Sequence, residues 1–188
     1  LGKPIKELYA TFEREPFAAA STAQVHKATL ADGTPVVVKV QRPNIVPKIK
    51  ADLSILQELI HTLSGRFEWM RDNDIPGIFE EFAKNLQDEL DYRIESFNAR
   101  RLADNMALFP EVTVPRMYSQ LTTAKVLTMD LVKGVKIVKV QEIAAAGWDP
   151  KVLSAAFLRV MIKQIVFDGY FHGDAHPGNI WCDLRDGH

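Results

Sequence analysis

The chain has very little cysteine: Cys182 is the single one in 188 residues. One thiol excludes an internal disulfide, so the fold must be held by its core and its hydrogen bonds. The scarcity is compatible with a reducing compartment, where disulfides are rare. Apolar residues make up 47% of the chain, a share typical of soluble globular proteins, which argues against a disordered or collagen-like chain.

A strong excess of charge of either sign is also missing. Lysine and arginine number 23 against 24 aspartate and glutamate residues, which gives a net charge of −1. Without a basic surplus or a basic run, the chain lacks the electrostatic footprint that nucleic-acid binding requires. We therefore expect no nucleic-acid partner.

Long hydrophobic runs are absent as well. The most apolar helical stretch, residues 152–170, is interrupted by Arg159, Lys163 and Asp168 and falls short of the roughly 20 apolar residues of a membrane span. Nothing at the start resembles a signal peptide, so we expect a soluble chain. The first residue is not methionine, and residues 183–188 read as a strand end and a turn. We expect a piece of a longer protein.

The first part of the chain predicts a β-hairpin. Residues 22–30 alternate loosely in polarity, Asp32-Gly33 is a turn pair, and residues 35–41 are rich in β-branched side chains. Two such runs joined by a short loop with Asp-Gly are typical of antiparallel strands.

Two long helices are predicted next. Residues 43–67 and 78–106 carry apolar side chains at spacings of three and four. The stripes are Ile45, Ile49, Leu53, Leu56 and Ile60 in the first, and Phe79, Phe82, Leu86, Leu90, Ile94 and Phe97 in the second.

The second half predicts short strands, a break and a helix. Residues 112–118 and 125–132 are short apolar segments, the first suited to an edge strand or strand end because it contains Pro115. Lys133-Gly134 breaks the pattern as a hinge would. Asp149-Pro150 then starts a helix that continues to Tyr170, followed by the polar segment 171–179 and a short strand over 180–182. This order predicts an α+β fold in two lobes, residues 1–132 and the start of a helical lobe over 133–188.

The polar segment after this helix could carry catalysis. It reads Phe-His-Gly-Asp-Ala-His-Pro-Gly-Asn, with Asp174 and Asn179 five residues apart. A kinase catalytic loop needs an aspartate to orient or deprotonate the attacking hydroxyl and an asparagine five positions later to hold a metal ion. Two alternatives stay open: a metal site made of His172, Asp174 and His176, and a polar loop whose aspartate caps a turn.

Lys39 lies within an otherwise apolar strand, Val-Val-Val-Lys-Val. A lysine in such a strand is often an edge or solvent-facing residue. Its place after a hairpin, about 20 residues beyond a loop of small residues, is also where a kinase carries the lysine that binds the α- and β-phosphates.

Such a lysine needs a carboxylate, and the second long helix offers Glu89, Asp91 and Glu95. Asp91 and Glu95 are four residues apart, so on one helix they would share a face and repel. Arg93 is badly placed to relieve both, so we expect Lys39, a bound Mg²⁺ or both to do so. A solvated acidic face is the alternative.

The loop of small residues before the hairpin consists of Ala18, Ala19, Ala20 and Ser21. Ordinary kinases use glycine here, because the backbone must approach phosphates and adopt positive φ. Alanine allows the close approach but disfavours positive φ, and a loop of alanines can also be simple small-residue packing.

Together these segments resemble the UbiB-like, or aarF-domain-containing, family of atypical kinases over nearly the whole chain. The matching segments are the alanine loop followed by Gln24-Val25-His26, the Lys39 strand followed by Gln41-Arg42-Pro43, the Glu89-x-Asp91 pair with Tyr92 and Glu95, and the loop from His172 to Asn179. The resemblance implies a protein-kinase-like fold with a truncated second lobe.

The resemblance also implies roles for these residues. Ala18 to Ser21 would approach ATP, Lys39 would bind its phosphates with Glu95 as partner, and Glu89 and Asp91 would face the nucleotide site. Asp174 would be the catalytic aspartate and Asn179 a Mg²⁺ ligand. The family's Lys-x-Gly-Gln and Asp-Phe-Gly motifs would lie before Leu1 and after His188.

For the whole protein, the resemblance implies an ATP-dependent kinase or ATPase that supports ubiquinone or other prenyl-lipid synthesis. It would be cytoplasmic, peripheral at the inner face of a membrane, with a prenyl lipid or proteins of a lipid-biosynthesis complex as partners. Two other functions fit the His-Gly-Asp loop. One is a small-molecule phosphotransferase of the aminoglycoside- or choline-kinase type, and the other is a non-catalytic, nucleotide-gated lipid-binding module.

Overall fold

The computed structural model describes residues 1–184. The chain forms two compact units, each built from two stretches: residues 1–97 with 117–129, and residues 98–116 with the chain from Asp130 onward. Each unit is described by itself. The lobe boundary expected at residues 132–133 stays a prediction. The turn expected over residues 183–188 lies mostly outside the described residues.

The first unit is organised around an antiparallel hairpin, as predicted. β3 (Ala23–Thr29) pairs with β4 (Pro35–Gln41) from Thr29↔Pro35 to Ala23↔Gln41. The turn is closed by Asp32, whose Oδ1 accepts the Thr34 N–H at 2.9 Å, and by Gly33, whose φ of +85° favours glycine.

Three further strands complete this sheet in the described chain. β1 (Thr11–Phe12) and β2 (Ala18–Ala19) both pair antiparallel with β3, and β5 (Val126–Asp130) lies beside β4. β4 is therefore an interior strand, so the interpretation of Lys39 as an edge residue is wrong.

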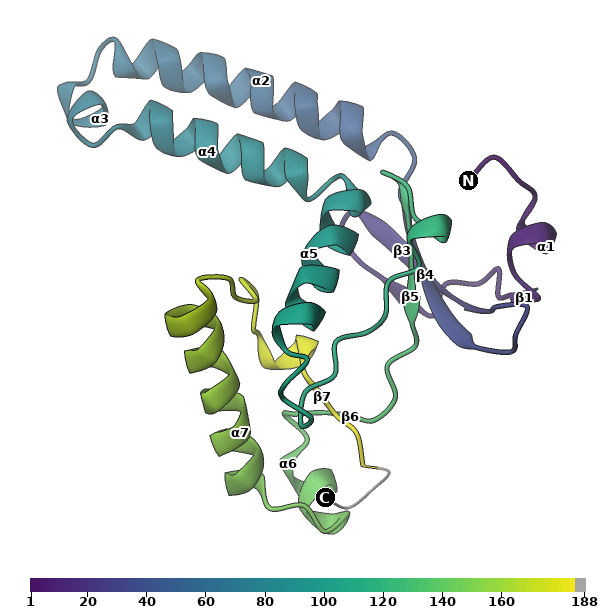
Figure 1. Cartoon of the computed structure of the whole chain (residues 1–188). Coiled ribbons are helices and arrows are strands. Elements are labelled where there is room, and N and C mark those ends of the chain that lie inside the picture. Colours follow the sequence, from purple (N-terminus) through teal and green to yellow (C-terminus); the bar gives the residue numbers. More distant parts are fainter. Residues whose placement is uncertain (185–188) are drawn as a thin grey trace. The chain divides into compact units, whose positions relative to one another are not determined.

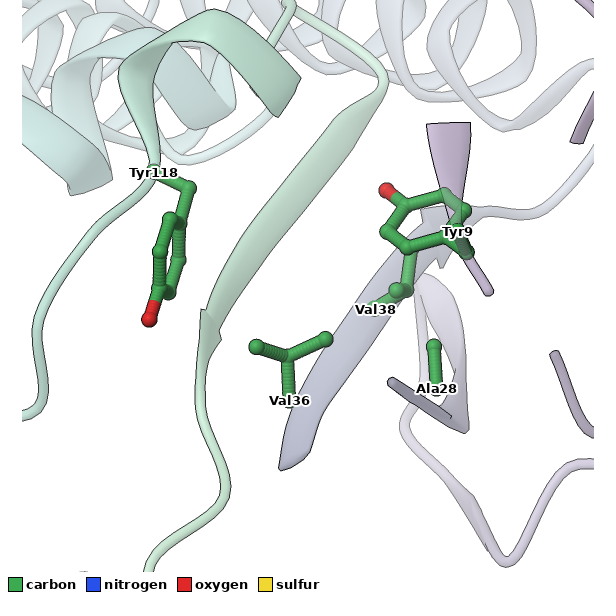
Figure 2. Close-up of a cluster of buried hydrophobic side chains, with 5 residues drawn as sticks. All are labelled: Tyr9, Ala28, Val36, Val38 and Tyr118. Atoms are coloured by element: carbon green, nitrogen blue, oxygen red, sulfur yellow. The ribbon is translucent and has the colours of Figure 1, made fainter. Parts of the chain in front are cut away.

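One face of the sheet carries a buried apolar cluster. Figure 2 shows its members, Tyr9, Ala28, Val36, Val38 and Tyr118. The Tyr9 hydroxyl forms a 2.7 Å hydrogen bond with the Thr128 hydroxyl, which satisfies both groups inside the core. Successive side chains of a strand alternate between faces, so Lys39 lies on the face opposite Val38.

A helical arm follows the hairpin. α2 (Ile45–Ser64) and α4 (Ile75–Asp88) lie side by side, joined at the far end by the short α3 (Glu68–Asp72) (Figure 1). The predicted first helix is thus confirmed. Asp74 caps the start of α4, because its Oδ1 accepts the Gly77 N–H at 3.3 Å.

The predicted second helix, residues 78–106, is wrong as a single helix. α4 ends at Asp88 and a separate helix, α5 (Tyr92–Asn105), begins after residues 89–91 (Figure 1). Asp91 caps the new helix because its Oδ1 accepts the Arg93 N–H at 3.0 Å. The apolar stripe continues across the break because Leu90, in the linker, is buried.

The predicted strand over residues 112–118 is also wrong. This segment contains no strand; it reaches β5 through the isolated bridge Met117↔Met129. Pro115 lacks a backbone donor, which limits regular pairing. The short helices α1 (Ile5–Leu8) and η1 (Ser119–Leu121) also belong to the first unit.

In the second unit the predicted order is found. β6 (Val135–Lys136) pairs with β7 (Trp181–Cys182), and between them come α6 (Val140–Ala145), α7 (Pro150–Ile162), a π-helical turn (Lys163–Asp168) and the 3₁₀ turn Pro177–Asn179. Asp149 caps α7 by accepting the Lys151 N–H at 2.8 Å. Gly134 has φ +126°, and a Cβ there would meet the Cys182 carbonyl oxygen at 2.2 Å, so the predicted break needs glycine.

The α+β class predicted from the sequence is confirmed. Among the helices of residues 1–184, every one falls short of the length and apolar character that a membrane crossing requires, including the stretch 152–170.

Candidate functional site

Lys39 and Glu95 form an ion pair in the first unit. The Lys39 Nζ lies 2.8 Å from Oε2 and 3.1 Å from Oε1 of Glu95, 56 residues further along the chain. The two side chains are 24% and 39% exposed. An exposed or half-exposed pair of this kind contributes only about 0–1 kcal/mol to folding, so it holds the ammonium group in place more than it stabilises the fold.

The ring of Tyr92 packs against the Lys39 ammonium group of this ion pair. Its ring centroid lies 4.8 Å from the Lys39 Nζ, a cation–π distance, and the residue is 1% exposed in a cluster with Ala23 and Leu127. Burial, and secondarily the charge of Glu95, raises the pKa of Tyr92 to about 12. The phenol therefore stays neutral, and its ring packs against the ammonium that Glu95 also holds.

The alanine loop is a tight turn next to β3, which separates it from the strand that carries Lys39. Ala18 pairs with Val25 and Val25 with Lys39, so the three residues lie in register across adjacent strands, with Lys39 roughly 10 Å from Ala18. The Ala20 N–H donates to the Ala23 carbonyl at 2.9 Å.

The four residues of this loop, Ala18 to Ser21, are exposed, which gives no support to the alternative of simple small-residue packing. In the described chain the non-glycine residues with positive φ are Asn44 and Asp74. The turn is therefore made of ordinary conformations, and alanine can replace glycine there without strain. Arg42 braces the turn by donating from Nε to the Ala20 carbonyl at 3.3 Å.

Glu89 and Asp91 are not gathered around Lys39. Glu89 is exposed at the C-terminal end of α4, and Asp91 pairs with Arg93, whose Nε lies 2.9 Å from Oδ1. The expected repulsion between Asp91 and Glu95 on one helix face is wrong, because Asp91 precedes α5 and each carboxylate has its own cation. Arg93, interpreted as badly placed, relieves Asp91.

Gln41 was not identified as a site residue, yet it fixes the linker that carries Asp91. The side chain is buried, and its amide nitrogen donates to the backbone carbonyls of Leu90 and Ala124. The available signal was a glutamine on the same face of the strand as Lys39, two residues away.

The Asp91–Arg93 pair predicts a pH-dependent contribution to stability. The hydrogen bond from Arg93 lowers the pKa of Asp91 below its ordinary value of 3.8. The stabilisation is therefore fully present above pH 3.8 and is lost as the pH falls through the lower pKa of the folded state. We expect Asp91→Asn to lower the free energy of unfolding at neutral pH and to match wild type at the acidic end, measured by urea unfolding from pH 6 to pH 2.5.

The control for this experiment is Arg93→Met. Removing the guanidinium should bring most of the same loss, because it is the main cause of the lowered pKa. A constant difference between wild type and Asp91→Asn at every pH would contradict the prediction.

In the second unit, Asp174 and Asn179 are brought together. The Asn179 amide nitrogen donates to Oδ2 of Asp174 at 2.8 Å and to the Asp174 carbonyl at 3.2 Å. The Asp174 N–H in turn donates to Nδ1 of His172 at 3.2 Å. The loop thus presents an exposed carboxylate that Asn179 orients, on a backbone that His172 and Asn179 hold in place.

The alternative of a metal site made of His172, Asp174 and His176 finds no support. No group of three or more metal-ligating side chains is gathered anywhere in residues 1–184. Each imidazole serves the loop instead: Nδ1 of His176 accepts the Gly178 N–H at 3.0 Å, as Nδ1 of His172 does for Asp174.

Oxygen ligands of the kind that Mg²⁺ prefers are present in this loop, namely the Asp174 carboxylate and the amide oxygen of Asn179. Lys39 and Glu95 belong to the first unit, and Asp174 and Asn179 to the second. The predicted residues thus form two groups: a lysine held by a carboxylate beside a backbone turn, suited to anions, and a carboxylate–amide pair, suited to a cation or an attacking hydroxyl.

Comparisons with known proteins bear on the family to which the chain belongs. The family model of the ABC1 atypical kinase-like domain matches residues 1–186. An uncharacterized protein of Synechocystis sp. is 41% identical over 96% of this chain, and Protein ACTIVITY OF BC1 COMPLEX KINASE 7, chloroplastic, of Arabidopsis thaliana is 40% identical over 99% of it. The chain spans 31% and 27% of the lengths of these two relatives.

A solved structure has the same fold. The complex of Rv3197 with erythromycin, from Mycobacterium tuberculosis, superposes with a TM-score of 0.75 at 30% identity, covering 97% of this chain and 45% of that one. The predicted kinase-like fold is thus confirmed, as is the resemblance found in the sequence. The chain belongs to the ABC1 atypical kinase-like family.

Proposed function

We propose that this chain is the nucleotide-binding core of an atypical kinase or ATPase that uses ATP with Mg²⁺. The observation that carries the proposal is the Lys39–Glu95 ion pair. Lys39 lies in register with Ala18, the first residue of the exposed turn, across the intervening strand β3. A partly buried ammonium group near an exposed turn of small residues, whose backbone a ligand can approach closely, is a binding arrangement for phosphates.

The role of Asp174 follows from the chemistry of phosphoryl transfer. As the terminal phosphoryl group passes from ATP to a hydroxyl or water oxygen, that oxygen must lose its proton, and a carboxylate on a hydrogen-bonded loop can orient and accept it. Asn179 would hold Mg²⁺ through its amide oxygen, and the metal would neutralise charge on the phosphates. Glu89 and Asp91 are the remaining carboxylates that we assign to the nucleotide side.

The effector or acceptor that we propose is a prenyl lipid, at a membrane surface and in the company of lipid-biosynthesis proteins. The resemblance to the UbiB-like family supports this class. The solved relative Rv3197 forms a complex with erythromycin, so a protein of this fold can bind an organic molecule other than a nucleotide.

The test is ATP hydrolysis by the full-length protein, measured as phosphate release. We expect release that requires Mg²⁺, disappears on chelation with EDTA, and increases in vesicles that contain a polyprenylated phenol. Vesicles without the phenol are the control for the lipid. Hydrolysis that is absent with Mg²⁺ and lipid, or that is indifferent to EDTA, would contradict the proposal; hydrolysis without a response to the phenol would contradict only its lipid part.

A further inference from the structure

The end of α7 is wound as a π-helix. Residues Lys163–Asp168 form this turn, and it ends at Gly169, whose φ is +58°. Such turns are rare and occur most often at functional sites. Here the turn is clamped by an ion pair across it, because the Lys163 Nζ lies 2.6 Å from Oδ2 of Asp168, with both side chains less than a quarter exposed.

Gln164 lies inside this π-helical turn and is 4% exposed. Its side-chain oxygen accepts the His172 N–H at 3.0 Å, and its amide nitrogen lies 3.7 Å from the sulfur of Met106. Its backbone carbonyl accepts the Tyr170 N–H at 3.1 Å. One buried residue therefore holds the backbone at Tyr170 and at His172, where the helix gives way to the polar loop.

The two ends of the Gln164 amide are not interchangeable. The nitrogen must donate, and it faces a thioether sulfur, a weak acceptor with no proton to give. The oxygen must accept, and it faces the backbone donor of His172. Without this oxygen the His172 N–H would lose a part-buried hydrogen bond, so the contact fixes where the loop begins.

From Gln164 the hydrogen bonds continue to Asp174. The His172 backbone N–H is held by the Gln164 side chain, and Nδ1 of His172 accepts the Asp174 N–H at 3.2 Å. Asn179 then holds the Asp174 carboxylate from the far side. His172, Asp174 and the residue between them are exposed, so Gln164 is the buried anchor of this exposed segment.

We propose that Gln164 is a positioning residue for the Asp174 loop: its side-chain oxygen fixes the backbone at His172, and through His172 it aims the Asp174 carboxylate. This inference rests on the proposed function, in which Asp174 acts on the attacking hydroxyl. It adds a residue that lies in the helix, ten positions before Asp174 and outside the polar loop itself.

The test uses the full-length protein with Gln164→Met and Gln164→Glu. Methionine keeps the volume and removes the acceptor, whereas a buried, protonated glutamate keeps an oxygen for the His172 N–H. With Gln164→Met we expect hydrogen exchange at His172 to accelerate about tenfold or more and kcat to fall about tenfold or more, with the KM for ATP nearly unchanged. Gln164→Glu should stay within about threefold of wild type in both measurements.

Two further variants guard this test. Gln57→Met, the same substitution at an exposed position of α2, should change neither hydrogen exchange at His172 nor kcat. If Gln164→Met does not fold, Gln164→Asn withdraws the oxygen by about one C–C bond length and should give the same pattern.

The proposal would be overturned if hydrogen exchange at His172 were unchanged in folded Gln164→Met, or in Gln164→Asn if the methionine variant does not fold. It would also be overturned if the Met and Glu variants lost kcat equally. The exchange measurement does not depend on ATP turnover. Accelerated exchange in a protein whose wild type never hydrolyses ATP would therefore refute the proposed function while upholding the anchor at His172.

Discussion

Replacing Asp174 by asparagine should lower the kcat for ATP hydrolysis by the full-length protein at least 100-fold, with little change in the KM for ATP. The reason is that the amide keeps the shape of the carboxylate but cannot accept the proton of the attacking oxygen, a contribution of about 10²- to 10⁴-fold. The loop should keep its structure, since an asparagine oxygen can still accept the 2.8 Å hydrogen bond from Asn179. Steady-state kinetics of phosphate release check this result.

The matched control is Asp104→Asn, the same chemical change at an exposed position of α5 in the same unit. It should leave kcat within about twofold of wild type, as expected for a surface substitution. Turnover by Asp174→Asn that equals that of the control would remove Asp174 from the chemistry and would sink the proposed role of the loop.

Replacing Lys39 by alanine should lower kcat/KM for ATP about 100-fold. The ammonium group would otherwise make charge-assisted hydrogen bonds to phosphate oxygens, worth about 1.5–3 kcal/mol, and each 1.4 kcal/mol corresponds to a factor of ten. The fold should survive, because the ion pair with Glu95 is partly exposed and contributes about 0–1 kcal/mol. Nucleotide titration and thermal unfolding of the same sample separate the two effects.

Lys50→Ala is the control, since Lys50 is an exposed lysine of α2. Glu95→Gln should cause a smaller loss than Lys39→Ala, because the lysine would remain but would be less well held. The double variant should be little worse than Lys39→Ala alone, as for residues that act as a unit. Additive losses would mean that Lys39 and Glu95 act independently and would contradict the ion pair as the phosphate-binding device.

Local elements were predictable where their signals are short-ranged. The hairpin was found because Asp32 and Gly33 provide the turn chemistry and the flanking residues are β-branched. The start of α7 was found because Asp149 and Pro150 form a cap that can be recognised from two residues.

The break between α4 and α5 was not predictable from periodicity. Leu90 continues the apolar stripe because it is buried, although it lies in the linker. What ends α4 and begins α5 is a set of contacts with distant strands, since the Tyr92 N–H donates to the Ala124 carbonyl at 3.2 Å and Gln41 holds the Leu90 carbonyl. Tertiary contacts of this kind override local propensity.

For the site, the sequence identified the residues but not all of their partners. Lys39 and Glu95 were matched through the resemblance, and the structure places them in contact. Asp91 was assigned to the same group, yet its strongest contact is with Arg93, two residues away across a helix start. Residue type and spacing predicted the kinds of groups, whereas the pairing depended on where α5 begins.

Tyr92 combines two demands in one side chain. It is the first residue of α5 and a buried member of the cluster with Ala23 and Leu127, and its ring lies under Lys39. A substitution there changes the free energy of folding and the placement of the Lys39 ammonium together, so neither can be selected without the other. In a deep mutational scan we therefore expect Tyr92 to accept fewer substitutions than any other residue of α5. Stabilising substitutions elsewhere should restore the folding of Tyr92 variants but not the placement of the Lys39 ammonium.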